Sequence, residues 1–347
     1  MSDVGSIKET LSELLLRWRE LRQQGQSCSA EMLCADRPEL TDELQRRIDA
    51  VEAMEHRLDM PPTGPPEGPI APLPTAPPPV PGYELLDILG EGGMGVVYRA
   101  RHLALKRVVA LKMMRPGTPA EHHPNRFRVE AEALARARHP NIIEIYEIGE
   151  AAGRPYFTME LVEGGSLARA LQDGPLPPQE AARLVLTLAE AIHAAHQKGI
   201  IHRDLKPANV LLASPVALAS PVALAPGVSR GADATPLDGL VPKLTDFGLA
   251  KRLEEERGQT HSGTVLGTPA YMAPEQAEGR TREVGPLADV WALGAILYEC
   301  LTGSAPFAGQ TAMEILLKVV SQELLPLTRL RPEVPRELET ICLKCLE

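Results

Sequence analysis

This chain has fewer positively charged than negatively charged residues: 36 Lys and Arg residues compared with 46 Asp and Glu residues, which gives a net charge of −10. This balance argues against a nucleic-acid partner, because such partners are bound by basic surfaces that neutralise phosphates. Long apolar runs are also absent: none approaches the roughly 18 residues of a membrane span, and no basic-then-apolar signal segment opens the chain. We therefore expect a cytoplasmic protein, and the sequence leaves open whether a membrane anchor follows residue 347.

Cysteines are few, and no group of them has the spacing of a zinc site. The five are Cys28, Cys34, Cys300, Cys342 and Cys345. The last two form a single C-x-x-C without a second pair, inside an amphipathic stretch. We interpret them as two thiols on one helix.

Residues 1–60 are expected to be helical. Ser6 and Glu9 form a capping-box pattern, and further helix starts are predicted at Ser29 and Pro38. Nothing in this segment looks catalytic. Two interpretations stay open: a module for regulation, dimerisation or partner binding, and a helical extension that packs on the next domain.

Residues 61–81 contain 11 prolines, too many for a helix or a sheet ladder. We interpret this stretch as a linker rather than as a ligand for an adaptor protein. From residue 82 to 347 the pattern changes to short strands followed by long helices. Strands are expected near 83–90, 95–101, 107–114, 143–149 and 155–161. Long helices are expected over 180–197 and 288–301. A sheet-rich lobe before a helical lobe leaves a cleft, which is a natural ligand site.

The stretch GEGGMGVVYRA at 90–100 carries the spacing G-x-G-x-x-G. Such glycines occur beneath a dinucleotide, over the phosphates of ATP, or in an ordinary tight turn. Val96, Val97 and Tyr98 favour an extended chain after the glycines rather than a helix. A hairpin over phosphates is therefore the better interpretation than a dinucleotide fingerprint.

Three further motifs follow in order: HRDLKPAN at 202–209, DFG at 246–248 and GTPAYMAPE at 267–275. With the glycines and with Lys112 in VVALKM, they make residues 83–347 resemble the eukaryotic-type serine/threonine protein kinases, in particular the bacterial members. The resemblance implies an α+β, bilobal fold with an antiparallel sheet in the N-lobe and helices in the C-lobe. It implies that the partners are ATP, magnesium and protein substrates.

The resemblance also implies roles for individual residues. Asp204 would orient the acceptor hydroxyl and take its proton, while Lys206 would neutralise the transferring phosphoryl group. Lys112 would hold the α- and β-phosphates, steered by Glu130; Glu132 is a near alternative that we expect on the surface. Asn209 and Asp246 are oxygen donors suited to magnesium. The implied ATP site comprises Leu89, Gly90, Glu91, Gly92, Gly93, Met94, Gly95, Val97, Ala110, Lys112, Met159, Glu160 and Val162.

Other matches imply packing rather than chemistry. Leu134, Ile145, His202 and Phe247 would stack as an internal apolar column, with Asp289 at its base. Arg203 precedes Asp204 and implies a phosphorylated partner in the segment between Gly248 and Gly267. The candidate phosphosites are Thr260, Ser262 and Thr264.

The chain departs from the family pattern at three places. One is Ala292, where the family usually has a serine, and we expect this change to be harmless. An Ala/Pro-rich insert at about 213–240, with the tandem copy ASPVALASPVAL, is expected to bulge from a hairpin without harming the site. The chain also stops inside a helix, before the arginine that family members pair with the glutamate at Glu275. We therefore expect a C-terminally truncated kinase domain from a longer protein.

These features predict a protein-serine/threonine kinase that autophosphorylates. The alternative is a pseudokinase, an ATP-binding scaffold for protein partners. Pseudokinases have usually lost the lysine, the loop aspartate or the metal-binding aspartate. The presence of Lys112, Asp204, Asn209 and Asp246 favours the catalytic interpretation.

Overall fold

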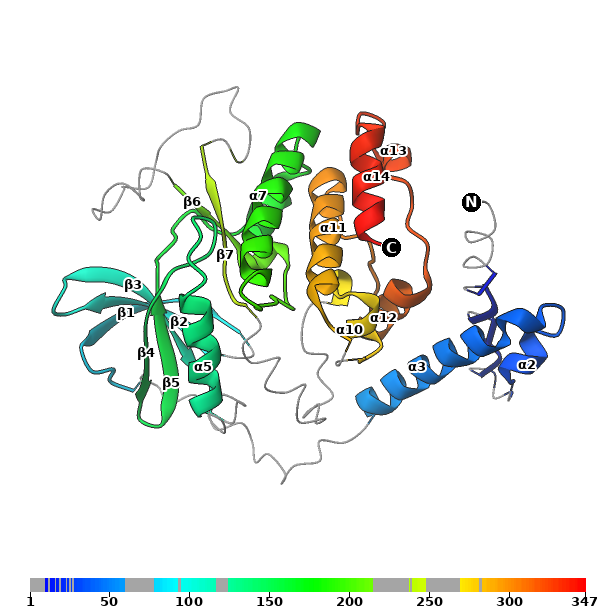
Figure 1. Ribbon diagram of the computed structural model, residues 1–347, viewed down its shortest axis with the longest axis horizontal. Coiled ribbons are helices and arrows are strands. Elements are labelled where there is room, and N and C mark those ends of the chain that lie inside the picture. The colour runs from blue at the N-terminus through cyan, green and yellow to red at the C-terminus, as the bar shows by residue number, and fades with distance from the viewer. Residues whose placement is uncertain are drawn as a thin grey trace.

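The computed structural model describes residues 10–59 except 12, 16, 19, 23, 25 and 27, and residues 78–92, 95–116, 124–214, 237, 239–247, 269–280 and 283–347. These residues form a sheet lobe, a helical lobe and a small helical module at the N-terminal end (Figure 1). The α+β bilobal architecture predicted from the sequence is confirmed. No helix among these residues combines the length and the apolarity that crossing a membrane requires.

The sheet lobe holds five antiparallel strands in the order β1-β2-β3-β5-β4. Their bounds are β1 Tyr83–Glu91, β2 Gly95–His102, β3 Arg107–Met114, β4 Ile145–Ala151 and β5 Arg154–Met159. Helix α5 (Pro124–Ala135) packs beside β4 and buries Phe127, Ala131 and Leu134. Those three residues stand at i, i+4 and i+7, the spacing of one helix face.

Alternation along the strands divides the sheet into two faces. Val109, Leu111 and Met113 of β3 join one core together with alternate residues of β2. Ala110 and Met114 join a second core, which continues into the helical lobe. Lys112 has the same parity as Ala110, so its side chain leaves the sheet on the face turned toward the helical lobe.

The helical lobe is built around α11 (Pro286–Thr302), which lies between α7 (Pro178–His196) and α14 (Arg336–Cys345) in Figure 1. Because α11 is covered on several sides, most of its residues are apolar and buried. Gly294 allows α14 to approach closely, since a Cβ there would lie 2.7 Å from Cβ of Cys345. Cys342 and Cys345 both lie on α14, as the sequence predicted.

Shorter elements complete this lobe. They are α6 Leu167–Ala170, η2 Leu171–Asp173, η3 Pro207–Asn209, η4 Pro269–Tyr271, α10 Pro274–Ala277, α12 Ala312–Ser321 and α13 Leu327–Leu330. Strands β6 (Val210–Ala213) and β7 (Val241–Leu244) form a hairpin in which Ala213 pairs with Val241. This pairing places the insert at the open end of the hairpin, as expected, although residues 215–236 lie outside the described part of the chain.

Leu237, within the expected insert, belongs to the folded core. Leu237 is 8% exposed and packs in the main apolar cluster, while its backbone N–H donates to Oε1 of Glu180 at 2.8 Å. The expectation that all of 213–240 bulges outward is therefore wrong at Leu237. Apolar composition alone could not distinguish this leucine from its neighbours in the insert.

The N-terminal module contains helical residues between 10 and 22, then α2 (Ala30–Leu33), η1 (Pro38–Leu40) and α3 (Thr41–Asp59). The predicted start at Ser29 is confirmed, because its hydroxyl accepts the Met32 N–H at 3.4 Å. Its core comprises Leu11, Leu15, Trp18, Ala30, Cys34, Leu40, Leu44, Ile48 and Val51. At the other end of the expected linker, Val80 is 4% exposed within the sheet core, so the sheet lobe begins before residue 82.

Candidate active site

Lys112 projects from the centre of β3, where it pairs with Val97 of β2 and with Phe157 of β5. Its side chain is only 12% exposed, and its Nζ lies 2.6 Å from Oδ1 of Asp246. The pair joins the sheet lobe to the segment after β7, over 134 positions of sequence. The contact with the carboxylate of Asp246 fixes where the ammonium group of this half-buried lysine lies.

Asp246 occupies backbone geometry that L-residues rarely adopt, with φ of 56°. The next residue, Phe247, is buried with its ring centroid 4.4 Å from that of His202. Packing of Phe247 therefore holds the positive φ of Asp246 and fixes where its carboxylate points. Such strained positions occur preferentially at functional sites.

The glycine-rich turn closes between β1 and β2, where Gly92 N–H donates to the Gly95 carbonyl at 2.9 Å. Gly95 is required by packing, since a Cβ there would lie 2.5 Å from the Met113 carbonyl oxygen. A Cβ built on Gly90 or Gly92 would have no heavy atom within 4 Å. These two glycines therefore leave room for a ligand to approach the backbone, whereas Gly95 allows β2 to pass close to β3.

The expected adenine-site residues lie along β2, β3 and the end of β5. Ala110 pairs with Met159 across the sheet, and both are buried. The Glu160 side chain is engaged elsewhere, because its Oε2 accepts from Nζ of Lys243 at 2.7 Å. The backbone N–H of Glu160 is also engaged, because it donates to the Glu144 carbonyl at 2.9 Å. Sequence reasoning missed Lys243, although a lysine on an apolar strand just before Asp246 was a usable signal.

Asp204 sits in a second cluster of polar groups. Lys206 Nζ donates to Oδ2 of Asp204 at 2.9 Å. The Asn209 amide nitrogen donates to the Asp204 carbonyl at 2.7 Å and to Oδ2 at 3.2 Å. Asn209 also joins the two clusters, since its carbonyl accepts the N–H of Thr245, the residue before Asp246, at 3.0 Å.

Asp289, at the start of α11, holds the backbone of this loop from below. Its carboxylate accepts the N–H of His202 at 2.8 Å and that of Arg203 at 2.9 Å, and it also contacts Nε2 of His196 at 2.7 Å. Arg203 has φ of 62°, so these bonds stabilise an otherwise unfavourable conformation. Burial lowers the pKa of His202, against the opposing charge of Asp289, and keeps its imidazole neutral at neutral pH. The expected stacking of His202 on Phe247 above Asp289 is confirmed.

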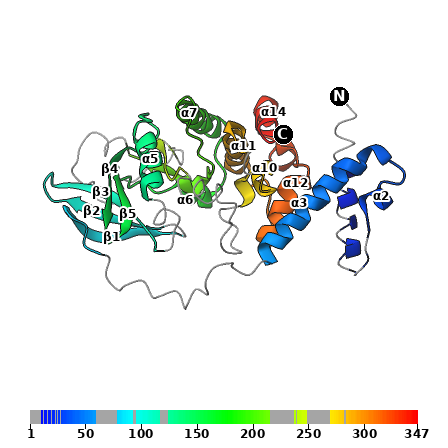
Figure 2. The same ribbon diagram turned by 60° about the horizontal axis from the view of Figure 1, so that its bottom comes forward.

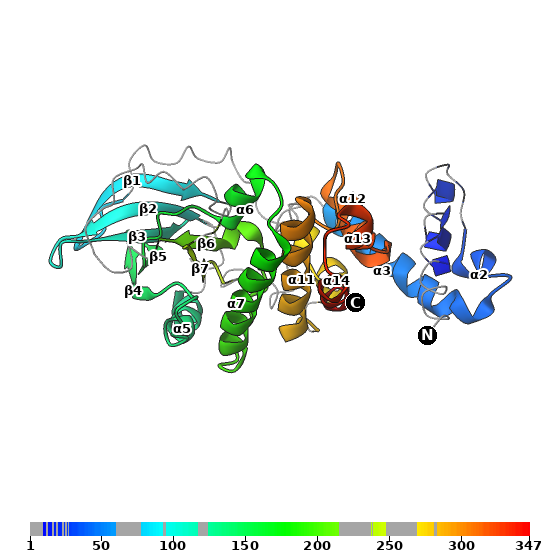
Figure 3. The ribbon, with the colours of Figure 1, turned by 90° about the horizontal axis from the view of Figure 1, so that it is seen from above.

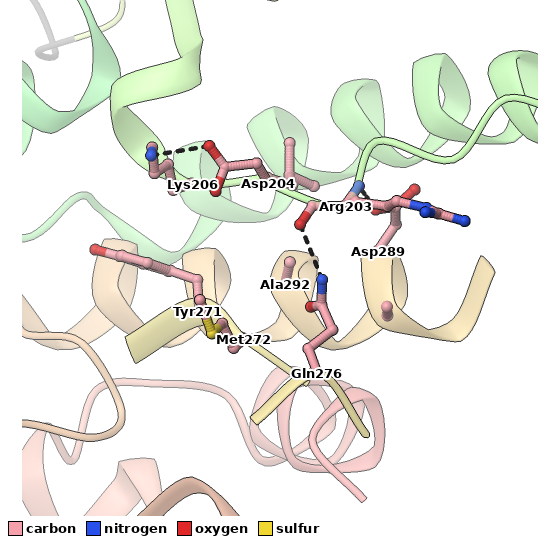
Figure 4. A pocket seen from close by; sticks show the side chains of 10 residues that line it. Arg203, Asp204, Lys206, Tyr271, Met272, Gln276, Asp289 and Ala292 are labelled. Atoms are coloured by element: carbon pink, nitrogen blue, oxygen red, sulfur yellow. Dashed lines mark hydrogen bonds and ion pairs between the residues drawn. The ribbon is translucent and has the colours of Figure 1, made fainter. Parts of the chain in front are cut away.

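Gln276 ties the other side of the loop to α10, as Figure 4 shows. Its Nε2 donates to the Arg203 carbonyl at 2.9 Å, and its Oε1 accepts the Ala273 N–H at 3.2 Å. Both peptide groups around Arg203 are therefore anchored, one by Asp289 and one by Gln276. Sequence reasoning missed Gln276, because only the folded chain brings it to Arg203.

These residues line a pocket beside the catalytic loop (Figure 4). Its lining comprises Arg203, Asp204, Leu205, Lys206, Tyr271, Met272, Gln276, Ala288, Asp289 and Ala292. The Tyr271 hydroxyl donates to Oε2 of Glu299 at 2.6 Å. Burial is the main cause that raises the pKa of both Tyr271 and Glu299, so the tyrosine remains protonated. The hydrogen bond to Glu299 holds the tyrosine ring in place.

The donor set fits magnesium shared with phosphates. Asn209 uses its amide nitrogen for both of its side-chain hydrogen bonds to Asp204, which leaves its oxygen for a cation. Asp246 offers a carboxylate of which Oδ1 contacts Lys112. No cluster of three or more His, Cys, Asp or Glu side chains that could hold a metal occurs among the described residues. Magnesium characteristically uses one or two protein ligands together with substrate phosphates, in agreement with this pair.

Several expected site residues lie outside the described part of the chain. These are Gly93, Met94, Thr260, Ser262 and Thr264, and also the side chain of Glu130 on α5. The alternative to Glu130, Glu132, pairs with Arg128 one helical turn away at 2.9 Å, on the outside of α5. Its surface position agrees with the sequence-based expectation.

Comparison with known proteins gives a consistent family match. A model of the family described as "Protein kinase domain" matches residues 83–347. The chain is 36% identical over 272 residues to the serine/threonine-protein kinase PknB of Mycobacterium leprae, covering 76% of this chain and 39% of the relative. It is 41% identical over 257 residues to the DNA damage-responsive serine/threonine-protein kinase RqkA of Deinococcus radiodurans, covering 73% and 34%.

A solved structure agrees with the sequence relatives. The crystal structure of a point mutant of the Mycobacterium tuberculosis PknI kinase domain superposes with a TM-score of 0.55 at 26% identity. The match covers 77% of this chain and 88% of that one. The chain spans well under half the length of the curated relatives described above, 39% of one and 34% of the other.

Proposed function

This chain belongs to the protein kinase family, and from that premise we propose that it is a serine/threonine protein kinase that transfers the γ-phosphoryl group of ATP to protein hydroxyls. One observation carries the proposal. The Lys112–Asp246 pair and the Asp204–Lys206–Asn209 cluster are joined through a backbone hydrogen bond from Thr245 to Asn209. Phosphoryl transfer needs positioning and charge neutralisation of this kind more than covalent catalysis.

The groups supply complementary functions. Asp204 would orient the hydroxyl of the acceptor and take its proton as the oxygen attacks the γ-phosphorus. The bond from that phosphorus to the β–γ bridging oxygen breaks, and ADP leaves. Lys206, already bonded to Asp204, would carry positive charge to the transferring group. Lys112 would do the same for the α- and β-phosphates.

The oxygens of Asn209 and Asp246 would hold magnesium at the phosphates. When bound, this cation would neutralise negative charge on the phosphates. The residues themselves contribute position: Asn209 is fixed by its bonds to Asp204, and Asp246 by Lys112 and by the packing of Phe247. The adenine ring would lie between Val97 and Ala110, next to the backbone at Met159, Glu160 and Val162.

The domain organisation follows the same proposal. Residues 82–347 would make up the kinase domain, preceded by the helical module of 1–60 and a linker within 61–81. At least one of Thr260, Ser262 and Thr264 would be autophosphorylated, and the Arg203 side chain would pair with the phosphate.

Phosphotransfer measured on the purified chain tests the proposal. Incubation with radiolabelled ATP, magnesium and a generic protein substrate should label serine and threonine, and Asp204→Asn should abolish the label. ATP binding by thermal shift, measured in parallel, separates the alternatives. Binding without any transfer would identify a pseudokinase and contradict the proposed activity.

A further inference from the structure

Helix α12 is apolar on more than one side. Leu316 and Val319 are buried in the main core of the helical lobe, which accounts for one face. Leu317, on a different face, is 7% exposed and belongs to another cluster. A surface helix normally buries a single stripe, so a second buried stripe indicates a second partner.

The cluster that contains Leu317 is the core of the N-terminal module. All its other fully buried members lie between Leu11 and Val51. Met313 precedes Leu317 by four residues on the same face, and it packs against both this cluster and the main core. Met313 and Leu317 thus form an outer edge of α12 that faces the module.

The element opposite this edge is α3. Leu44, Ile48 and Val51 stand at i, i+4 and i+7 on α3 and are buried in the shared cluster. Figures 2 and 3 both show α3 running alongside α12, and the two helices are in contact. The module therefore uses α3 both to close its own core and to reach the helical lobe.

We propose that the outer edge of α12 is a docking site for this chain's own helical module, residues 10–59, bound in cis. The edge has only two apolar side chains, which is too little surface for a stable complex between separate molecules. Tethering changes that balance, because a short connection raises the effective concentration of a linked module to about the millimolar range. Residues 60–77 provide the connection between α3 and the sheet lobe.

The docking site lies close to the elements that flank the Asp204 loop. Helix α12 also contacts η4 and α10, the elements that carry Tyr271 and Gln276, and Gln276 is bonded to the Arg203 carbonyl. A module that can leave α12 would uncover Leu317 one helix away from Gln276. The proposal concerns the docking itself and does not depend on the proposed kinase activity.

The chain offers a sharp test with a matched control. Leu317→Asp places a charge in the contact, whereas Leu330→Asp makes the same change at a leucine of α13 that is 50% exposed. In the full chain, Leu317→Asp should raise amide hydrogen exchange in α12 and α3 by about tenfold, the effect of losing a few apolar contacts. It should also increase the radius of gyration, and Leu330→Asp should change neither quantity.

Tryptophan fluorescence controls for unfolding of the module. The chain has two tryptophans, of which Trp18 lies in the module core and Trp291 in α11. In a Trp291→Phe background, unchanged emission from Trp18 in Leu317→Asp would show that the module is released while folded. Leu317→Ala, which removes the contact without introducing charge, should give the same exchange pattern in smaller measure.

Two results would overturn the proposal. If neither Leu317 variant altered exchange or dimensions, Leu317 would not hold the module. If the unmodified chain sedimented as a dimer that Leu317→Asp converted to a monomer, the module would dock on a second copy and not in cis. Both readouts are structural, so either result would leave the kinase assignment intact.

Discussion

The two charged clusters of the cleft are built in different ways. The Lys112–Asp246 contact is an ion pair between side chains from different lobes, and the Asp246 side chain is 34% exposed. Asp204 instead sits on a loop whose backbone is bonded to Asp289 and Gln276 and whose side chain is bonded to Lys206 and Asn209. The loop that carries Asp204 is therefore preorganised by one lobe, whereas the Lys112–Asp246 pair, on the proposed nucleotide side, depends on how the two lobes meet.

This difference has a functional consequence. A site that needs lobe closure can respond to nucleotide, while a loop fixed by the helical lobe keeps its geometry in either state. Variants on the nucleotide side should accordingly change binding and turnover together. Variants on the loop should change turnover alone.

Breaking the nucleotide side should have the largest effect. Lys112→Met or Asp246→Asn should lower kcat/KM by about 10³-fold, because each removes charge directed at the phosphates in a partly dry site. Both should also weaken ATP affinity. Isothermal titration with ATP and magnesium, beside steady-state kinetics, measures the two effects, and Lys344→Met, at a lysine of α14 whose side chain is 74% exposed, is the control. Full activity in Lys112→Met would remove this residue from the mechanism.

Breaking the loop at its central carboxylate should have the next largest effect. Asp204→Asn keeps the shape of the side chain but loses the proton acceptor, so kcat should fall by about 10²-fold or more. The dissociation constant for ATP should stay within about twofold, since Asp204 acts on the hydroxyl. Retention of more than a few per cent of kcat would contradict its role as base.

The roles of the motif residues can be predicted from the sequence because these residues stand close together in the chain at a characteristic spacing. Asp204, Lys206 and Asn209 follow one another on one loop, and Asp246 follows a recognisable strand. Gln276 and Lys243 could not be assigned this way, because their partners Arg203 and Glu160 lie far away in sequence. The double role of α12 was equally hidden, since Leu316 and Leu317 are indistinguishable until their neighbours are known.

Variants in the segment between Gly248 and Gly267 should affect the Asp204 loop without affecting the Lys112–Asp246 pair. Phosphorylation of Thr260, Ser262 or Thr264 would place roughly two negative charges near Arg203. Arg203 belongs to the loop that carries Asp204 and not to the proposed nucleotide side. Replacing all three with alanine should lower kcat by about 10- to 100-fold, the effect of one to two charge-assisted hydrogen bonds, and should leave ATP affinity unchanged.

Mass spectrometry after incubation with ATP identifies which of the three residues is modified. Thr268→Ala serves as a contrast in the mass spectrum, since the family resemblance implies that the hydroxyl of Thr268 contacts Asp204 and Lys206 and does not carry phosphate. An unchanged rate in the triple alanine variant would exclude the switch.

Gln276 tests whether the anchoring of the loop matters for turnover. Gln276→Leu removes both hydrogen bonds, and kcat should fall by about 3- to 10-fold, as expected for one or two neutral bonds. Gln276→Glu keeps an acceptor for the Ala273 N–H but cannot donate to the Arg203 carbonyl, so it isolates the second bond. Gln179→Leu, at an exposed site on α7, is the control. A change confined to thermal stability, with kcat unaffected, would show that Gln276 only supports the fold.

The smallest effect on kcat is expected for replacing the insert in the hairpin that links the two clusters. The β6–β7 hairpin connects Asn209 to Asp246 and carries the insert at its open end. Replacing residues 215–236 with a short Gly/Ser linker keeps Leu237 and its bond to Glu180, so melting temperature and kcat should both stay unchanged. Leu237→Ala in the same background should cost about 2 kcal/mol, because it empties a buried site, and should lower the melting temperature by several degrees. Deleting 214–238 outright should resemble Leu237→Ala and not the linker variant. If instead the linker variant folded but lost phosphotransfer, the insert would have a function that neither cluster explains.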